Sequence, residues 1–229
     1  MLDDPPLLTI KAGFQRPDPA KVAALKDAQT SHLVDAMDGR GALDWTIKPC
    51  DPDNASFVGI AVTCHAYPAD NLALFGAMEI AQSGDVIMCA NDSYRLTALV
   101  GDLVAGMMKN AGLAALVTDG LARDRVGIVA AGLPLFCAGI VPNSPAKNGP
   151  GSVGLPVTVG GVPVSSGDVI VGDADGVVVV PRARLAEVAS RLDAIRAAEQ
   201  AAEEKVRGGQ TVMGEIAALL ASSRVRRLG

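Results

Sequence analysis

The sequence has 229 residues, of which 49% are hydrophobic and 20% are charged, and its formal net charge at pH 7 is −5. This composition excludes a disordered chain, and the length suffices for a domain with a sizeable core. The acidic balance and the lack of Lys and Arg runs argue against nucleic acid as a partner.

We expect no membrane partner, because no apolar run reaches the roughly 18 to 20 residues that a spanning helix requires. Residues 1–6 are acidic and contain two prolines, which does not fit a signal peptide. The four cysteines, at positions 50, 64, 89 and 137, show no C-x-x-C spacing. They are typical of reduced, buried thiols in a cytoplasmic protein.

Helical and strand patterns alternate through the first two thirds of the chain. The apolar residues of the helix over 101–110 share one face, and we expect Met107 and Met108 to lie in the core. In chain order we expect helices opened by Asp18-Pro19 and Thr30-Ser31, a short strand at Trp45 to Ile47, a strand over 57–65, a helix over 71–82 capped by Asp70, a strand over 85–89, the helix over 101–110, and strands over 113–117 and 135–137.

The last third of the chain opens with a loop over 141–156 that is rich in Pro, Gly, Ser and Asn, and loops of this length tend to be functional. Valine-rich strands follow, and the glycines between them indicate hairpins, so this part of the sheet should be partly antiparallel. Residues 182–206 form an amphipathic helix, and a short helix lies near 215–221.

These elements predict a single-domain α/β fold, a layered sandwich with a mixed central β-sheet flanked by helices. We expect residues 1–20 to form an N-terminal arm, 21–181 the α/β core domain, and 182–229 C-terminal helices that pack on the core.

Arg123 and Asp124 follow the apolar run 113–117 after the turn at Asp119-Gly120. Polar residues beyond the carboxyl end of a buried strand occupy the place where α/β folds hold their chemistry. The guanidinium offers a fork for a carboxylate, and the aspartate offers an oxygen ligand for a hard cation. Taken alone, the pair is more often a surface ion pair.

Asp102 should lie near this pair. The strands over 85–89 and 113–117, joined through one helix, should run parallel, so the helix that starts at Gly101 begins at the edge where the second strand ends. The free amides of Gly101, Leu103 and Val104 then form a site for a carboxylate. The alternative for Asp102 is an acid favoured only by the helix dipole.

The spacing of Asp102, twenty intervening residues, then Arg123-Asp124 resembles the motif of the class II pyruvate aldolases of the RraA-like superfamily. These are the 4-hydroxy-4-methyl-2-oxoglutarate / 4-carboxy-4-hydroxy-2-oxoadipate aldolases. The resemblance covers roughly residues 20 to 210. Further matches are Thr30 to Ala36, Asp70-Asn71-Leu72, Gly84-Asp85-Val86, Asp119-Gly120, Gly167-Asp168-Val169 and Asp173 to Pro181.

The resemblance implies an RraA-like fold, similar to the swivelling phosphohistidine domains, and a metal-dependent retro-aldol cleavage that releases pyruvate. The partner would be a small-molecule 2-oxo acid from aromatic degradation, and the cofactor a divalent cation, Mg²⁺ or Mn²⁺. It further implies oxaloacetate decarboxylation as a side activity. The assembly would be a homotrimer or homohexamer with sites between subunits, so the C-terminal helices would also pack on a neighbouring subunit.

The residue roles also come from the resemblance. Asp124 would be the direct metal ligand, and Arg123 would bind the substrate carboxylate and 2-oxo oxygen. Asp102 would act through a water as the base for the 4-hydroxyl proton. The amides of Leu103 and Val104, beside Gly101, would bind the 1-carboxylate.

Glu199 stands on the apolar stripe of the long C-terminal helix, between Ile195 and Ala202. The family uses a glutamate from the adjacent subunit to hold a water on the metal. We assign Glu199 to this role in the metal site, with Glu203 as the alternative. A solvated charge in a helix rich in Ala and Glu is an equally good interpretation.

Other functions remain open at this point. The RraA regulators share the fold without catalysis and bind a ribonuclease, and other superfamily members are lyases or hydrolases acting on related 2-oxo acids. Residues 149–154 spell G-x-G-x-x-G but lack the strand-turn-helix context of a dinucleotide site. His32 and His65 are too far apart in sequence to indicate a metal site, and His65 is more readily explained as a satisfied edge residue.

Overall fold

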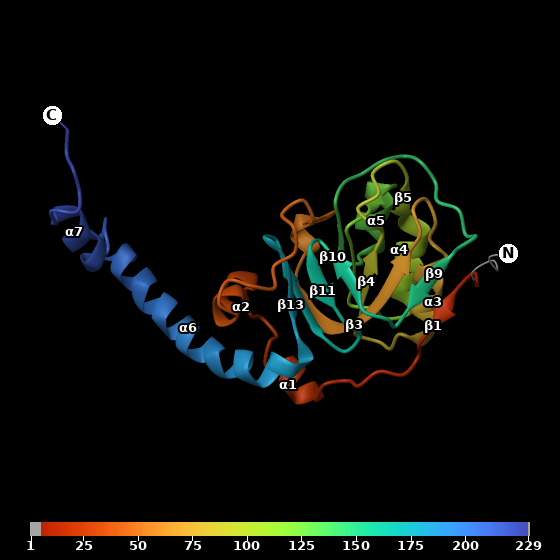
Figure 1. Ribbon diagram of the computed structural model, residues 1–229, viewed down its shortest axis with the longest axis horizontal. Coiled ribbons are helices and arrows are strands. Elements are labelled where there is room, and N and C mark those ends of the chain that lie inside the picture. Colours follow the sequence, from red (N-terminus) through yellow and green to blue (C-terminus); the bar gives the residue numbers. More distant parts are fainter. Residues whose placement is uncertain (1–5, 229) are drawn as a thin grey trace. The chain divides into compact units, whose positions relative to one another are not determined.

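The computed structural model describes residues 6–228, and the chain divides into two compact units between Leu192 and Asp193. The first unit is built around a mixed sheet in the strand order β1-β9-β3-β4-β6-β8-β2, with β12 and β13 added beside β3 (Figure 1). These strands are β1 (Thr9–Ile10), β2 (Lys48–Pro49), β3 (Phe57–Ala66), β4 (Val86–Ala90), β6 (Ala115–Thr118), β8 (Leu135–Cys137), β9 (Gly151–Val153), β12 (Val169–Asp173) and β13 (Gly176–Val180).

Two further pairs of strands stand apart from this sheet. They are the hairpin β10 (Val157–Val159) and β11 (Val162–Val164), and the pair β5 (Ala98–Val100) and β7 (Leu121–Ala122). The helices are α1 (Pro19–Ala23), α2 (Thr30–Ala36), α3 (Leu72–Ile80), α4 (Asp102–Asn110), α5 (Arg125–Ala131), α6 (Leu185–Arg207) and α7 (Gly214–Ala221), with 3₁₀ turns η1 (Pro52–Asn54) and η2 (Arg182–Arg184).

The expected mixed sheet is confirmed. Strands β3, β4, β6 and β8 run parallel to one another, whereas β9 and β12 pair with β3 in the antiparallel sense. Parallel strands need a crossover, and α3 supplies the crossover between β3 and β4. The β10–β11 hairpin is antiparallel around Gly160-Gly161, as expected, but it pairs outside the main sheet.

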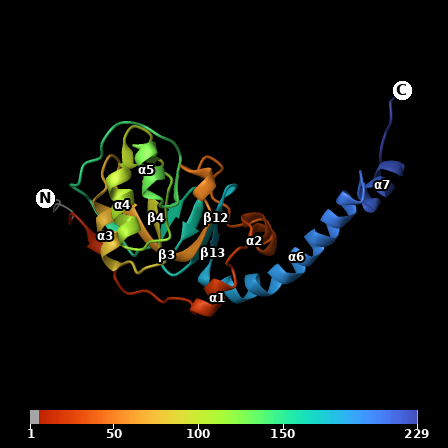
Figure 2. The same cartoon turned by 180° about the vertical axis from the view of Figure 1, so that it is seen from behind.

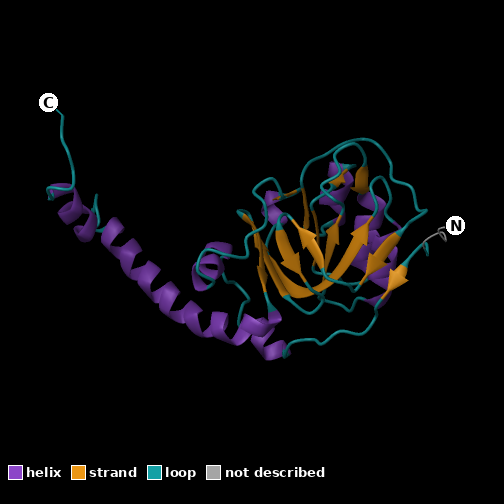
Figure 3. Cartoon of the chain, in the orientation of Figure 1, coloured by secondary structure: helices purple, strands orange, loops and turns teal. Residues whose placement is uncertain are grey.

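Side chains alternate between two buried faces of the sheet. Along β4, Ile87 and Cys89 join the core on one side, whereas Val86 and Met88 join the core on the other. Helices α3, α4 and α5 cover the first face (Figure 2), and the β10–β11 hairpin packs on the second (Figures 1 and 3). Burial on both sides explains why the central strands are nearly uniform apolar runs.

Asp85 anchors the N-terminal segment to the sheet. Its carboxylate is 2% exposed and accepts two hydrogen bonds from Arg16, at 2.7 and 2.6 Å, and one from the backbone N–H of Gln82. The hydrogen bond to Asp85 raises the pKa of Arg16. The Gly-Asp-Val turn at this position therefore has a structural role.

The structure corrects three local expectations. Trp45 lies in a turn with 78% of its surface exposed, and the short strand is Lys48–Pro49 instead. The loop over 141–156 contains strand β9, which pairs with β1 and β3. Met107 is 48% exposed and only Met108 is core, because α4 turns Ala105 and Met108 inward.

The four cysteines are free and buried, in agreement with the prediction of reduced thiols. Cys50 and Cys137 lie with their sulfur atoms 3.6 Å apart, beyond the length of a disulfide bond. Cys64 and Cys89 face each other across the parallel pair β3 and β4.

The second unit contains the end of α6 and all of α7. The predicted apolar stripe of α6 is buried only at Leu185, Val188 and Leu192, all of which belong to the first unit. Helix α7 buries none of its residues within the described chain. Among the helices of residues 6–228, none combines the length and the apolar character needed to cross a bilayer.

Candidate functional site

Two parallel strand-to-helix turns lie side by side and create the site. Strand β5 runs into Gly101 and α4, and strand β7 runs into Arg123, Asp124 and α5. The two strands pair in parallel, and the backbone N–H of Arg123 donates to the carbonyl of Val100 at 2.9 Å. The sequence predicted this juxtaposition from the strands that became β4 and β6, whereas β5 and β7 produce it.

Asp124 begins helix α5 in an unusual way. Its backbone is left-handed, with φ 56°, and its side chain does not cap the helix. The carboxylate lies instead against Gly101, where a Cβ atom would stand 2.7 Å from Asp124 Oδ2. Gly101 therefore permits the close approach, and within residues 6–228 the carboxylate of Asp124 accepts no hydrogen bond. Its lone pairs remain for a ligand.

Arg123 connects this carboxylate to the neighbouring loop. Its Nε lies 3.2 Å from Asp124 Oδ2, an ion pair without hydrogen-bond geometry, and its Nη1 donates to Ser144 Oγ. The side chain is one-third exposed. The outer face of the guanidinium can therefore still bind a carboxylate or an oxo group.

Asp102 occupies the first turn of α4 and lies against α5. The absence of a side chain at Gly127 makes room for it, because a Cβ there would stand 2.6 Å from Asp102 Cβ and 2.9 Å from its Cγ. One oxygen, Oδ1, accepts a hydrogen bond from the amide of Leu103 at 2.7 Å. The Leu103 amide is thus engaged here, while Val104 is the third residue of the helix, a position whose N–H has no carbonyl partner within an α-helix.

A cavity of about 220 Å³ collects most of the predicted site. Asp102 and Arg123 line it, together with the predicted substrate-binding positions Gly101, Leu103 and Val104. Asp124 is not in its wall but borders it through Gly101 and Arg123.

Sequence reasoning missed three polar residues of this cavity, Asn71, Ser144 and Lys147. Asn71 is 2% exposed; its Nδ2 donates to the carbonyl of Leu99 at 3.0 Å, and its Oδ1 has no hydrogen-bond partner in the described chain. The sequence predicts Asp70 as the cap of a helix that begins at Asn71 and indicates no further role for Asn71, and no local signal predicts that the loop over 141–149 lies beside it.

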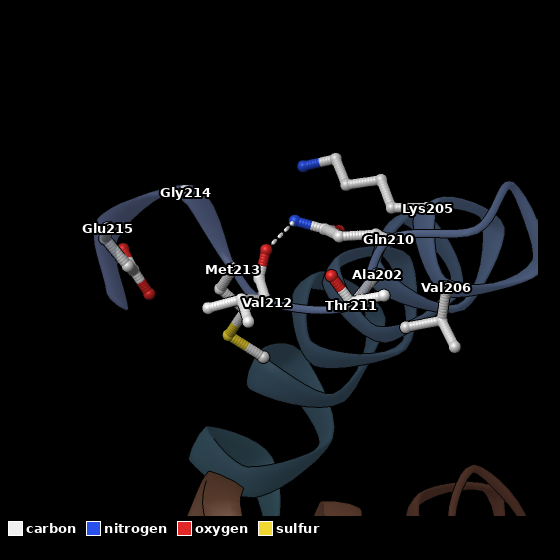
Figure 4. A pocket seen from close by; sticks show the side chains of 9 residues that line it. All are labelled: Ala202, Lys205, Val206, Gln210, Thr211, Val212, Met213, Gly214 and Glu215. Carbon is white, nitrogen blue, oxygen red and sulfur yellow. Dashed lines mark hydrogen bonds between the residues drawn. The ribbon is translucent and has the colours of Figure 1, made fainter. Parts of the chain in front are cut away.

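A second cavity, of about 350 Å³, lies in the C-terminal unit around the turn between α6 and α7 (Figure 4). Gln210 Nε2 donates to the carbonyl of Val212 at 3.1 Å across this turn. Lys205 and Glu215 are the charged residues of its wall. It holds no group of converging acids and bases, so we do not assign catalysis to it.

His65 and the glycine-rich motif agree with the expectations from the sequence. His65 Nε2 lies 3.1 Å from Asp92 Oδ1, as expected for a satisfied edge residue. Residues 149–154 lead into strand β9 and not into a helix, so the dinucleotide reading fails. Within residues 6–228 there is no cluster of three or more His, Cys, Asp or Glu side chains fit to enclose a metal ion. A cation here would thus rely on few protein ligands.

Glu199 and Glu203 belong to the C-terminal unit, on α6. Glu203 pairs with Arg207 at 2.9 Å, one helical turn along. The role assigned to Glu199 in the metal site stays a prediction.

The comparison with known families covers the region just described. A family model of the RraA-like proteins, described as aldolase/RraA, matches residues 30–179. The chain belongs to this family. A curated relative from Halalkalibacterium halodurans is 37% identical over 185 residues, which is 81% of this chain and 88% of the relative. That relative carries the provisional name 4-hydroxy-4-methyl-2-oxoglutarate aldolase.

Solved structures share the fold. A protein of Pseudomonas syringae pv. tomato, described as uncharacterized, aligns with a TM-score of 0.75 and 28% identity over 86% of this chain and 97% of its own. Streptomyces coelicolor RraAS2, described as an unusual member of the RNase ES inhibitor RraA family, aligns with a TM-score of 0.74 and 27% identity over 83% and 100%. The predicted RraA-like α/β fold is confirmed, and both a named aldolase and a named inhibitor are among the similar proteins.

Proposed function

We propose that this chain is a divalent-metal-dependent aldolase, a carbon–carbon lyase of class II. Its substrates would be of the 4-hydroxy-4-methyl-2-oxoglutarate or 4-carboxy-4-hydroxy-2-oxoadipate type, cleaved to pyruvate and a second 2-oxo acid. The observation that carries the proposal is the carboxylate of Asp124, which lies beside Arg123 and the start of α4 and accepts no hydrogen bond from residues 6–228. The name of the Halalkalibacterium relative supports the same reaction.

The residues fit a hard cation. Asp124 offers open carboxylate oxygens, and Mg²⁺ keeps several waters and needs only one or two protein carboxylates. When bound, Mg²⁺ or Mn²⁺ supplies Lewis acidity that stabilises negative charge on the 2-oxo oxygen.

Arg123 and α4 would hold the substrate. The guanidinium binds the 2-oxo oxygen and the adjacent carboxylate, and the amide of Val104 at the helix N-terminus donates to the 1-carboxylate. Leu103 can join once Asp102 Oδ1 releases its amide. The same donors favour the enolate more than the ketone, because charge develops on the 2-oxo oxygen as the bond breaks.

Asp102 would take the proton of the 4-hydroxyl through a water. As the C4 carbonyl forms, the bond between C3 and C4 breaks, and its electron pair passes into the enolate of pyruvate. Protonation at C3 then completes pyruvate. Oxaloacetate forms the same enolate when it loses CO₂, which explains the expected decarboxylase side activity.

A neighbouring subunit would complete the site. We propose that a homotrimer or homohexamer brings α6 of another copy to the cavity, where Glu199, or alternatively Glu203, orders a water on the metal.

The test is pyruvate release from 4-hydroxy-4-methyl-2-oxoglutarate and from oxaloacetate, followed by coupling to lactate dehydrogenase. We expect turnover that EDTA abolishes and that Mg²⁺ or Mn²⁺ restores. The absence of metal-stimulated pyruvate release from either compound would favour the second candidate, a non-catalytic regulator that binds a ribonuclease. The name of the Streptomyces coelicolor structure is the observation behind that alternative.

A further inference from the structure

The loop that closes the cavity is held by long-range hydrogen bonds. Near its start, the backbone N–H of Val141 donates to the carbonyl of Ala122 at 2.9 Å. The side chain of Asn143 donates to the carbonyl of Leu96 at 2.8 Å, and the backbone carbonyl of Asn143 accepts from the N–H of Ala98 at 3.1 Å. The loop is therefore attached to the β5 and β7 region that carries the site.

The backbone on both sides of Lys147 is fixed as well. Ala146 exchanges hydrogen bonds with the start of α3, donating to the carbonyl of Ala69 at 2.7 Å and accepting from Asn71 at 3.0 Å. The amides of Asn148 and Gly149 donate to Asp70 Oδ2, at 2.5 and 3.1 Å. Because the backbone on both sides of Lys147 is held by hydrogen bonds, less backbone conformational entropy is lost when the lysine binds a ligand.

Lys147 lines the same cavity as Arg123 and Asp102, yet its ammonium forms no hydrogen bond or ion pair with any of residues 6–228. Arg123 already faces Asp124 and Ser144. Among residues 6–228, no acidic group pairs with the exposed side chain of Lys147 at this cavity. Lys147 comes from the loop that follows Ser144, whereas the amides that suit the first carboxylate of a substrate belong to α4.

We infer that Lys147 is a specificity-determining residue that binds the second, distal carboxylate of the substrate. This inference rests on the proposed function. It selects 2-oxo acids that carry an anionic group on C4 over those that end in an alkyl group. An ammonium suits this task because it is a point charge that tolerates several carboxylate orientations.

The experiment compares two substrates that differ only in this group. 4-Hydroxy-4-methyl-2-oxoglutarate carries the distal carboxylate, and 4-hydroxy-4-methyl-2-oxopentanoate has a methyl group in its place. We expect Lys147→Met to lower kcat/KM for the first about 30-fold, the range for a hydrogen bond to a charged group, and to leave kcat/KM for the second nearly unchanged. Lys147→Arg keeps the charge and should retain most of the preference.

Two controls separate this inference from its alternatives. Lys26→Met removes the same charge from an exposed helix-flanking position, so it reports any general effect of net charge on substrate attraction. The exchange of the pyruvate methyl protons with deuterated water, followed by NMR, tests the Arg123 and Asp124 machinery on a molecule without a distal carboxylate.

The inference is supported if Lys147→Met exchanges the pyruvate methyl protons at the wild-type rate and loses its preference for the substrate with the distal carboxylate. The role of Lys147 is overturned, and the proposed aldolase function is kept, if the variant exchanges at the wild-type rate but kcat/KM falls equally for both substrates or for neither. A wild-type protein that neither exchanges nor cleaves in the presence of Mg²⁺ overturns the proposed function itself.

Discussion

Two sets of aspartates in the chain have carboxylates that differ in the hydrogen bonds they accept. Five aspartates at turns of the first unit each accept hydrogen bonds from two or more donor groups of the protein. At the α4 and α5 turns, Asp102 accepts one and Asp124 accepts none from the described residues. The saturated group is Asp70, Asp85, Asp119, Asp168 and Asp173.

This difference teaches how structural and chemical roles can be told apart when residue type is the same. A carboxylate whose lone pairs are filled by the protein stabilises a turn and is costly to remove. A carboxylate that gives up its helix cap, as Asp124 does, contributes little to stability and remains available for a ligand. Substitutions in the two groups should therefore affect different measurements.

The largest effect is expected for Asp124→Asn. Loss of the charge should lower turnover by about 10³-fold, because the Lewis acid of the reaction would lose its ligand. The melting temperature should change little, since the side chain accepts no hydrogen bond from residues 6–228. Metal-dependent pyruvate release and a thermal melt test both parts, and normal kinetics in the variant would remove Asp124 from the site.

The opposite pattern is expected for Asp85→Ala. Its carboxylate is buried and holds Arg16 at 2.6 Å, so its loss should lower the free energy of unfolding by about 2 to 3 kcal/mol. The partial exposure of Arg16 keeps the figure below that of a fully buried pair. Urea unfolding measures the change, and kcat per folded molecule should stay at the wild-type value. A catalytic defect without destabilisation would contradict the division into two groups.

The smallest effect on activity is expected for Gly127→Ala, a substitution for which the chain offers a matched control. The new methyl group would stand 2.6 Å from Asp102 Cβ and would displace Asp102, the proposed base, from the cavity, so we expect kcat to fall about tenfold. Gly106→Ala is the matched control on the neighbouring helix, because nothing lies within 4 Å of its added Cβ. Both gain helix propensity, so similar stabilities with different kcat values would assign the loss to Asp102. Equal kcat values would mean that the position of Asp102 does not matter.

The sequence predicted those parts of the fold in which the signal is local and repeated. Strands β3, β4 and β6 are long apolar runs, and α4 has clear boundaries, so these elements were found nearly at their observed limits. The sequence does not predict strands β5 and β7, because three and two residues are too few to show the alternation of apolar and polar residues that indicates a strand. Helix α5 was missed because Asp124 does not cap it and Gly127 interrupts its pattern.

For the site, spacing identified the three charged residues that meet near one cavity, but it could not identify Lys147. That residue reaches the cavity because Asp70, more than seventy residues earlier, holds the backbone of Asn148 and Gly149. The hydrogen bonds that order this loop connect distant segments, and no local propensity encodes them. Composition alone therefore described the loop only as long and rich in glycine and proline.

The left-handed backbone of Asp124 limits what evolution can put at this position. At φ 56°, the ordinary occupants are glycine, asparagine and aspartate, and only the last carries a negative charge. A glutamate would add strain as well as length, so no other acid can replace it without a backbone penalty. If Asp124 holds the metal as proposed, a descendant of this chain that kept the fold and lost the reaction would be expected to show asparagine or glycine at this position.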